Sequence, residues 1–128
     1  MICHVATVAG TYAVDVEEER VLGPADAPVE PERVELELPR LVAASASGST
    51  VVAVVERRPP LVVSADAGTT WREAGGGLPA GFAVTVDPAD PDLVLFAARN
   101  RLYLSRDGGR FWRSLAPELP DILAVRWA

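Results

Sequence analysis

The sequence predicts an all-β protein whose chain folds into repeated four-stranded antiparallel sheets. Three observations predict this fold class: short β-prone runs recur along the chain, turn residues separate them, and the pattern repeats with a constant period. The dipeptide Leu-Pro marks the period at Leu38, Leu78 and Leu119. Several short strands per repeat at such a period are typical of the blades of a β-propeller.

The second and third repeats each carry four expected strands. Clusters of Gly, Pro, Asp and Ser separate the strands and supply turn chemistry, and the Pro runs argue against long helices. We therefore expect almost no helix. The strands are expected at 41–46, 50–56, 60–65, 70–74, 82–86, 92–98, 101–106 and 111–115.

The first repeat is degenerate. Thr11–Leu22 aligns without gaps on Arg101–Trp112, but "EEE" replaces the Asp-Gly turn. An acidic, Pro-rich stretch after Leu22 is expected to be an exposed loop. The following Arg33–Pro39 alternates apolar and charged residues, which predicts a solvent-facing outer strand.

These repeats divide a single domain into three blades. We expect the first blade over about 1–39, the second over about 40–79 and the third over about 80–120. Residues 121–128 match the innermost strand of a following blade.

Composition excludes several classes of function. The net charge of −6 argues against nonspecific binding to nucleic acid. No apolar run reaches the ~20 residues that span a bilayer, and the N-terminus does not resemble a signal peptide, so we expect a cytoplasmic location. Cys3 is the only cysteine and is expected to pack as a small apolar residue. With His4 as the only histidine, expected to be at least partly buried, we expect neither a metal nor a cofactor.

Two motifs carry a resemblance to a known family. The segments "SADAGTTW", Ser64–Trp71, and "SRDGGRFW", Ser105–Trp112, lie one repeat apart. They resemble the Asp-box, or BNR repeat, with the pattern Ser-x-Asp-x-Gly-x-Thr-Trp; Phe111 stands where the second motif would have Thr. Asp-box repeats occur in sialidases, sortilin-type receptors, photosystem assembly factors and many bacterial propellers.

The resemblance implies a structural role for the motif, at the turn between the third and fourth strands of a blade. The Asp side chains can accept backbone hydrogen bonds within the turn, the Gly residues allow positive φ, and the Trp residues can pack between blades. The structural residues expected from the motif are Ser64, Asp66, Gly68, Thr70, Trp71, Ser105, Asp107, Gly109 and Trp112.

The favoured hypothesis is a non-catalytic scaffold or binding module. None of the catalytic residues of sialidases is carried over, because the only tyrosines, Tyr12 and Tyr103, lack the required context. The alternative is a glycosidase-like hydrolase that acts on a carbohydrate or other polar substrate at the channel mouth, which would need two close carboxylates. An assembly factor whose ring face docks a protein is a third possibility.

Arginines mark the expected ligand face. In a propeller, the turns between second and third strands and the links between blades gather on one face. An Arg-rich mouth there can receive an anionic or carbohydrate ligand or an acidic protein segment; the alternative is that these arginines are solvated or paired with carboxylates. The residues concerned are Arg40, Arg57, Arg58, Arg99 and Arg101.

The two ends of the chain are complementary. The last strand supplies the innermost strand that the first blade lacks, and a closed ring of three blades is too tight. We therefore expect two chains to exchange their last strands and form a six-bladed, two-fold symmetric homodimer. A fragment of a longer propeller is the rival interpretation. The expected closure residues are Ile122, Leu123, Val125 and Trp127 against Cys3 and Val5.

Overall fold

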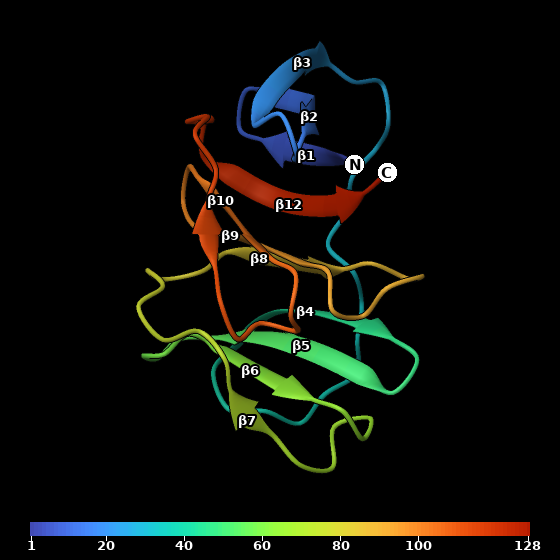
Figure 1. Cartoon of the computed structure of the whole chain (residues 1–128), viewed down its shortest axis with the longest axis vertical. Helices are drawn as coiled ribbons and strands as arrows, with labels where there is room; N and C mark the ends of the chain where they lie inside the picture. The colour runs from blue at the N-terminus through green and yellow to red at the C-terminus, as the bar shows by residue number, and fades with distance from the viewer.

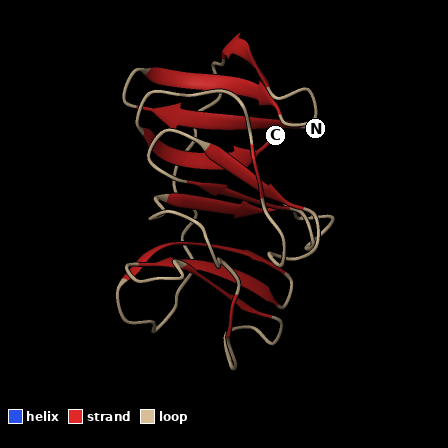
Figure 2. Ribbon diagram, turned by 60° about the vertical axis from the view of Figure 1, so that its left-hand side comes forward, coloured by secondary structure: helices blue, strands red, loops and turns tan.

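The computed structural model describes all 128 residues and contains twelve β-strands and no helix. The strands form three four-stranded antiparallel sheets that stack face to face (Figures 1 and 2). None of the elements is a helix that could cross a membrane. The all-β fold class with three propeller blades in one chain is confirmed.

The second blade is the sheet β4-β5-β6-β7. Its strands are Leu41–Ser47, Thr50–Val55, Leu61–Ser64 and Arg72–Glu73. All of β6 and all of β5 except its first residue are buried, as expected for continuous apolar runs that have a layer on each face.

The third blade is the sheet β8-β9-β10-β11, which repeats the second. Its strands are Ala83–Val86, Val94–Ala97, Leu102–Ser105 and Arg113–Ser114. This blade lies in the middle of the stack, because its innermost strand β8 contacts both β4 and β12 (Figure 1).

The first blade is completed by the end of the same chain. Its order is β12-β1-β2-β3, with strands Ile122–Trp127, Ile2–Thr7, Gly10–Asp15 and Arg20–Pro24. The antiparallel ladder between β1 and β12 places Cys3 opposite Trp127 and Val5 opposite Val125.

The pairing within one chain therefore does not require a closed ring of three blades. The three sheets form an open arc rather than a ring, since β8 contacts β4 and β12 but β4 and β12 make no contact with each other. The first blade follows the third in space instead of preceding the second. The within-chain pairing completes the first sheet without a second copy.

Residues 25–40, the linker, carry the chain from β3 back to β4 at the opposite end of the stack (Figure 1). The strand expected over Arg33–Pro39 is not present. The alternation of apolar and charged residues in this segment does reflect burial, because Val34, Leu36 and Leu38 are half-buried against the outer face of the second blade. This segment, the strap, crosses the face of a sheet instead of following an edge, so it makes no strand ladder.

Two apolar cores join the blades. One lies between the second and third blades and includes Phe96, whose ring makes edge-to-face contacts with Tyr103 and Trp112. The other lies between the third and first blades. Its members are Cys3, Val5, Val14, Val16, Ala83, Leu93, Leu95, Ala97, Leu102, Leu104, Leu115, Leu119, Ile122 and Val125.

The acidic turn of the first blade has a docking role. Arg72, in the fourth strand of the second blade, donates a hydrogen bond of 2.7 Å to the Gly108 carbonyl in the turn of the third blade. Arg113, its equivalent in the third blade, instead reaches the carboxylate of Glu19 at 3.9 Å. Glu19 also accepts a hydrogen bond of 2.8 Å from the Ala116 amide. The "EEE" turn therefore replaces backbone acceptors with carboxylates and docks on the third blade.

Cys3 provides a test of the packed first blade. The thiol is fully buried, and this burial raises its pKa to about 12. We expect Ellman's reagent to react with Cys3 only after unfolding, because the thiolate is the reacting form. The reaction rate measured at neutral pH with and without urea checks this. Fast reaction in native buffer would show that β1 is not held between β12 and β2.

Candidate functional site

The turn Ser64–Trp71, the first box turn, is closed by its own polar side chains. Ser64 Oγ donates to Asp66 Oδ1 at 2.7 Å and accepts from the Gly68 amide at 2.8 Å. The Asp66 carboxylate also accepts from the Thr70 amide at 2.8 Å and the Thr70 hydroxyl at 2.6 Å. Gly68 has φ +91°, a conformation that residues with a Cβ rarely adopt.

The second box turn, Ser105–Trp112, repeats this arrangement. Ser105 Oγ donates to Asp107 at 2.8 Å and accepts from the Gly109 amide at 2.8 Å. Phe111 stands at the position of Thr70 and has no hydroxyl group. From this residue, Asp107 accepts only the hydrogen bond of the backbone amide, at 2.9 Å. Gly109 has φ +92°.

Hydrogen bonds hold both turn carboxylates in the charged form. The Thr70 hydroxyl and amide, followed by Ser64, lower the pKa of Asp66 to about 2. The pKa of Asp107 is also lowered, chiefly by the Phe111 amide and then by Ser105. A carboxylate that is charged and engaged in this way is suited to closing a turn, not to donating a proton at neutral pH.

The two box tryptophans differ in one contact. Trp112 Nε1 donates to Gly109 in its own turn at 2.9 Å and to the Ala74 carbonyl of the second blade at 2.8 Å. Trp71 Nε1 donates only to Gly68 in its own turn, at 3.1 Å. Trp112 therefore ties two blades together, whereas Trp71 has no blade on its outer side.

The five candidate arginines separate into two groups. Arg99 pairs with Asp121 at 3.1 Å, and Arg101 pairs with Glu118 at 2.8 Å. The carboxylates of Asp121 and Glu118 are thus engaged with arginines. The remaining three, Arg40, Arg57 and Arg58, are exposed on the second blade and take part in none of the ion pairs.

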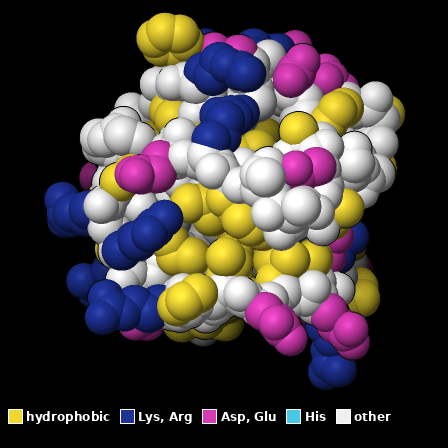
Figure 3. Space-filling view, turned by 90° about the horizontal axis from the view of Figure 1, so that it is seen from below, with side chains coloured by type: hydrophobic (Ala, Val, Ile, Leu, Met, Phe, Trp, Pro, Cys, Tyr) yellow, Lys and Arg dark blue, Asp and Glu magenta, His cyan; other side chains and the backbone are white.

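The outer face of the second blade, hereafter the flank, carries a small pocket of about 280 Å³. Figure 3 views the molecule from this end, where hydrophobic side chains gather at the centre and arginines lie beside them. Val55 and Val62 are buried, Leu38 and Trp71 are half-buried, and the arginines are exposed. The pocket is lined by Leu38, Pro39, Arg40, Val55, Arg57, Val62 and Trp71.

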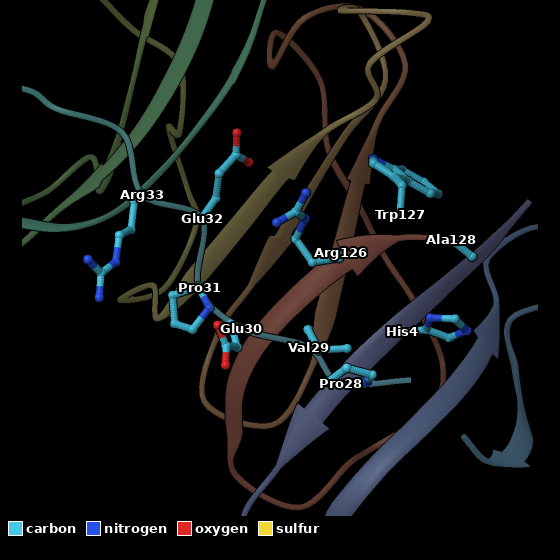
Figure 4. Close-up of a pocket in the computed structure, with 10 residues that line it drawn as sticks. All are labelled: His4, Pro28, Val29, Glu30, Pro31, Glu32, Arg33, Arg126, Trp127 and Ala128. Atoms are coloured by element: carbon cyan, nitrogen blue, oxygen red, sulfur yellow. The ribbon is translucent and has the colours of Figure 1, made fainter. Parts of the chain in front are cut away.

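A wider hollow lies between linker residues 28–33 and the paired strands β12 and β1 (Figure 4). His4 and Arg126, which are opposite each other in the ladder, line it together with acidic linker residues. Glu32 is committed elsewhere, because its carboxylate accepts from Ser45 Oγ at 2.7 Å and from the Ala46 amide at 3.2 Å. No three His, Cys, Asp or Glu side chains are placed to hold a metal ion.

Sequence reasoning identified Arg40, Arg57 and Trp71 but missed the valines between them. The signal was present in the alignment of the second repeat on the third. The ladder registers place Ala53 where the third blade has Phe96, so a large side chain is missing at one point of an otherwise repeated face.

The fold is that of a β-propeller, with three blades in this chain. A solved structure described as "YCF48 bound to D1 peptide" is similar, with a TM-score of 0.53, 18% identity and 93% of this chain covered. The chain spans 38% of that structure's length, and at this identity the likeness shows the fold alone. No protein-family model and no curated protein matches the sequence.

The lowered pKa of Asp66 predicts acid sensitivity. An unfolded Asp titrates near 4, so the stabilisation is complete above that pH and is lost as pH falls toward 2. We expect Asp66→Asn to flatten the dependence of the free energy of unfolding on pH between about 4 and 2. Urea denaturation across this range measures it, with the exposed linker substitution Asp26→Asn as control. An unchanged slope in Asp66→Asn would contradict the prediction.

Substitutions of the two tryptophans are expected to lower the free energy of unfolding by unequal amounts. Trp112→Phe removes a hydrogen bond between blades that Trp71→Phe leaves unaffected. We expect Trp112→Phe to lower the free energy of unfolding by about 1 kcal/mol more than Trp71→Phe. Urea titrations followed by circular dichroism compare the two variants, and equal losses would show that the bond to Ala74 contributes nothing measurable.

Proposed function

We propose that this protein is a non-catalytic binding module of Asp-box blades that assembles as a homodimer. The observation that carries the proposal is the flank, which has the composition of an interface between blades but has no blade against it. The geometry of both box turns supports their assignment to the Asp-box.

Repeat equivalence identifies the flank as an unfinished interface. The third blade packs on the second through one face, and the residues at the same positions of the second blade form the flank. The strap alone covers them. By the registers of the strand ladders, Val94, Phe96, Tyr103 and Trp112 correspond to Val51, Ala53, Val62 and Trp71.

The linker allows a second arrangement of the same parts. It spans residues 25–40, whereas the links between the other blades span only 74–82 and 115–121. If β1–β3 moved to the flank of their own chain, the linker would become an ordinary connection between neighbouring blades. The β1–β12 ladder would then form between two chains, and two arcs would close a six-bladed ring.

The exchange keeps the ladder between β1 and β12 and gains favourable apolar contacts. The ladder between β1 and β12 is the same in both arrangements, so its hydrogen bonds are neither gained nor lost. Exchange requires the strap to leave the flank and costs association entropy. It gains the apolar burial between two sheets and a neighbouring blade beside Trp71.

The arginines that form no ion pairs indicate a face that could bind a ligand. Arg40, Arg57 and Arg58 give the flank side of the second blade a positive rim, which suits an anionic ligand or an acidic protein segment. The similar solved structure is described as bound to a peptide, and we include a peptide among the ligands proposed for this chain.

A disulfide tests the exchange. His4 lies directly opposite Arg126 in the ladder, within reach of a disulfide for paired antiparallel residues. We expect oxidised Cys3→Ser/His4→Cys/Arg126→Cys to run as a covalent dimer on a non-reducing gel. Light scattering of the unmodified protein should give twice 13.6 kDa.

The control is Cys3→Ser/His4→Cys alone, which lacks the second thiol and should stay monomeric on the gel. Complete oxidation within single chains would contradict exchange, even if light scattering reported a dimer. A monomer mass at all concentrations up to about 100 µM would contradict the homodimer itself.

A further inference from the structure

The flank differs from the matching face of the third blade along one row of side chains that crosses the strands. In the second blade the row consists of Ala44, Ala53 and Val62, which lie directly opposite one another in the ladders. The same row of the third blade consists of three larger residues, Val84, Phe96 and Tyr103. The smaller side chains of the second blade leave room for a polypeptide segment to lie across this face.

The strap occupies this room. Val34, Leu36 and Leu38 are half-buried against the row, together with Trp71. Leu36 lies beside the first box turn, since its Cδ2 atom is 3.6 Å from the position that a Cβ on Gly68 would take. The charged residues between the three apolar ones are exposed. Because the side chains of an extended chain alternate between two sides, the strap turns an apolar side to the flank.

A carboxylate anchors the beginning of the strap. Glu32 accepts a hydrogen bond of 2.7 Å from Ser45 Oγ and one of 3.2 Å from the Ala46 amide, both on the innermost strand β4. Ser45 is fully buried, and its Oγ already accepts a hydrogen bond of 3.0 Å from the Val86 amide. The hydroxyl proton of Ser45 is therefore available for donation. The hydroxyl and the amide together form a site with two donors, which suits a carboxylate.

Side chains alone hold the strap on the flank. No backbone hydrogen bond joins residues 26–39 to a sheet, and none of the ion pairs includes these residues. The attachment rests on three half-buried apolar side chains and one carboxylate. A segment held in this way can leave without breaking a strand ladder, so its local opening costs less than unfolding of a blade.

We propose that the flank is a docking groove for an extended acidic segment of another protein, and that the strap is the intramolecular competitor of that segment. The recognised segment has the pattern of the strap, a glutamate followed by apolar residues two, four and six positions later. Its carboxylate binds the two donors of β4, and its apolar side chains replace those of the strap. The strap has to leave the flank before this segment can bind.

This inference rests on the proposed binding function and deepens it, because it names the class of segment that is bound. It does not rest on the homodimer, in which β1–β3 would cover the same flank. If no segment binds, the disulfide and mass tests of the homodimer keep their meaning. If the protein is a monomer in those tests, the groove is still open to its own test.

The test frees the groove in the full-length chain. Val34→Asp/Leu36→Asp, the released variant, places carboxylates where the strap meets apolar side chains, which should detach it. Arg33→Asp is the matched control, because it changes the net charge by the same amount at an exposed position. Leu36→Asp alone is measured in parallel as a milder release, in case the double variant does not fold. Circular dichroism and light scattering identify the concentrations at which each variant is a folded monomer.

The probe is the acetylated and amidated peptide PERVELELP, which has the sequence of residues 31–39. A tethered segment has an effective concentration in the millimolar range. The strap is bound most of the time only if its intrinsic Kd lies well below that concentration. We therefore expect the free peptide to bind the released variant with a Kd at or below about 100 µM. The unmodified protein and Arg33→Asp should bind it at least about tenfold more weakly, because their own straps compete.

Trp71 reports where the peptide binds. Its Nε1–H resonance in ¹⁵N-labelled protein is assigned by its absence from Trp71→Phe. We expect this resonance to move in the released variant and to return toward its position in the unmodified protein as the peptide is added. A peptide that binds elsewhere would not restore it.

Two altered peptides test the chemistry of recognition. Glu32→Gln in the peptide should weaken binding about tenfold, since it removes the charge from the two hydrogen bonds at β4. Glu35→Gln is the matched control, because Glu35 of the strap is exposed and has no partner there. It should leave the Kd unchanged.

Three outcomes would overturn the proposal. The first is a folded, monomeric released variant whose Trp71 resonance does not respond to about 1 mM peptide. The second is equal binding of the two altered peptides. The third is binding to the unmodified protein that is as tight as binding to the released variant, since the strap would then not compete.

Discussion

The pairing of the last strand with the first is the contact on which the rest of the structure depends. Without β12, β1 would be a bare edge, and Cys3 and Val5 would lose the neighbours Val125 and Trp127 that cover them. The core between the third and first blades takes Ile122 and Val125 from this strand. One ladder of backbone hydrogen bonds therefore completes a sheet and the larger of the two cores between blades.

Much of this fold was predictable because the same pattern of β-prone runs and turn residues occurs in both the second and the third repeat. The strands of the second and third blades follow from β-prone runs between Gly, Pro and Asp turns. The strap shows the limit of such reasoning, since the alternation of Val34, Leu36 and Leu38 with charged residues reports which side is buried but not whether an edge lies alongside. The spatial order of the blades could not be predicted from the repeat pattern either, because a long linker is compatible with more than one order.

The candidate site was predictable only in part for a related reason. Motif reasoning found the shared pattern of the box turns, which is structural, and the arginines, which are charged and therefore conspicuous. The floor of the pocket is formed by Val55 and Val62, which stand where the next repeat has Ala98 and Tyr103. In a repeat protein, the differences between equivalent positions carry the information about binding, while the identities report the scaffold.

The intrachain ladder also has a consequence for biosynthesis. The residues of β1 are synthesised before their partners in β12, with the second and third blades between them in the sequence. The second and third blades, whose strands pair with near neighbours in sequence, can fold while β1–β3 still wait for β12. During that interval the apolar side chains of the first blade have no core, and an edge is open to any other nascent chain. Elongation rate thus becomes a factor in whether the first blade finds its own last strand or that of a neighbour.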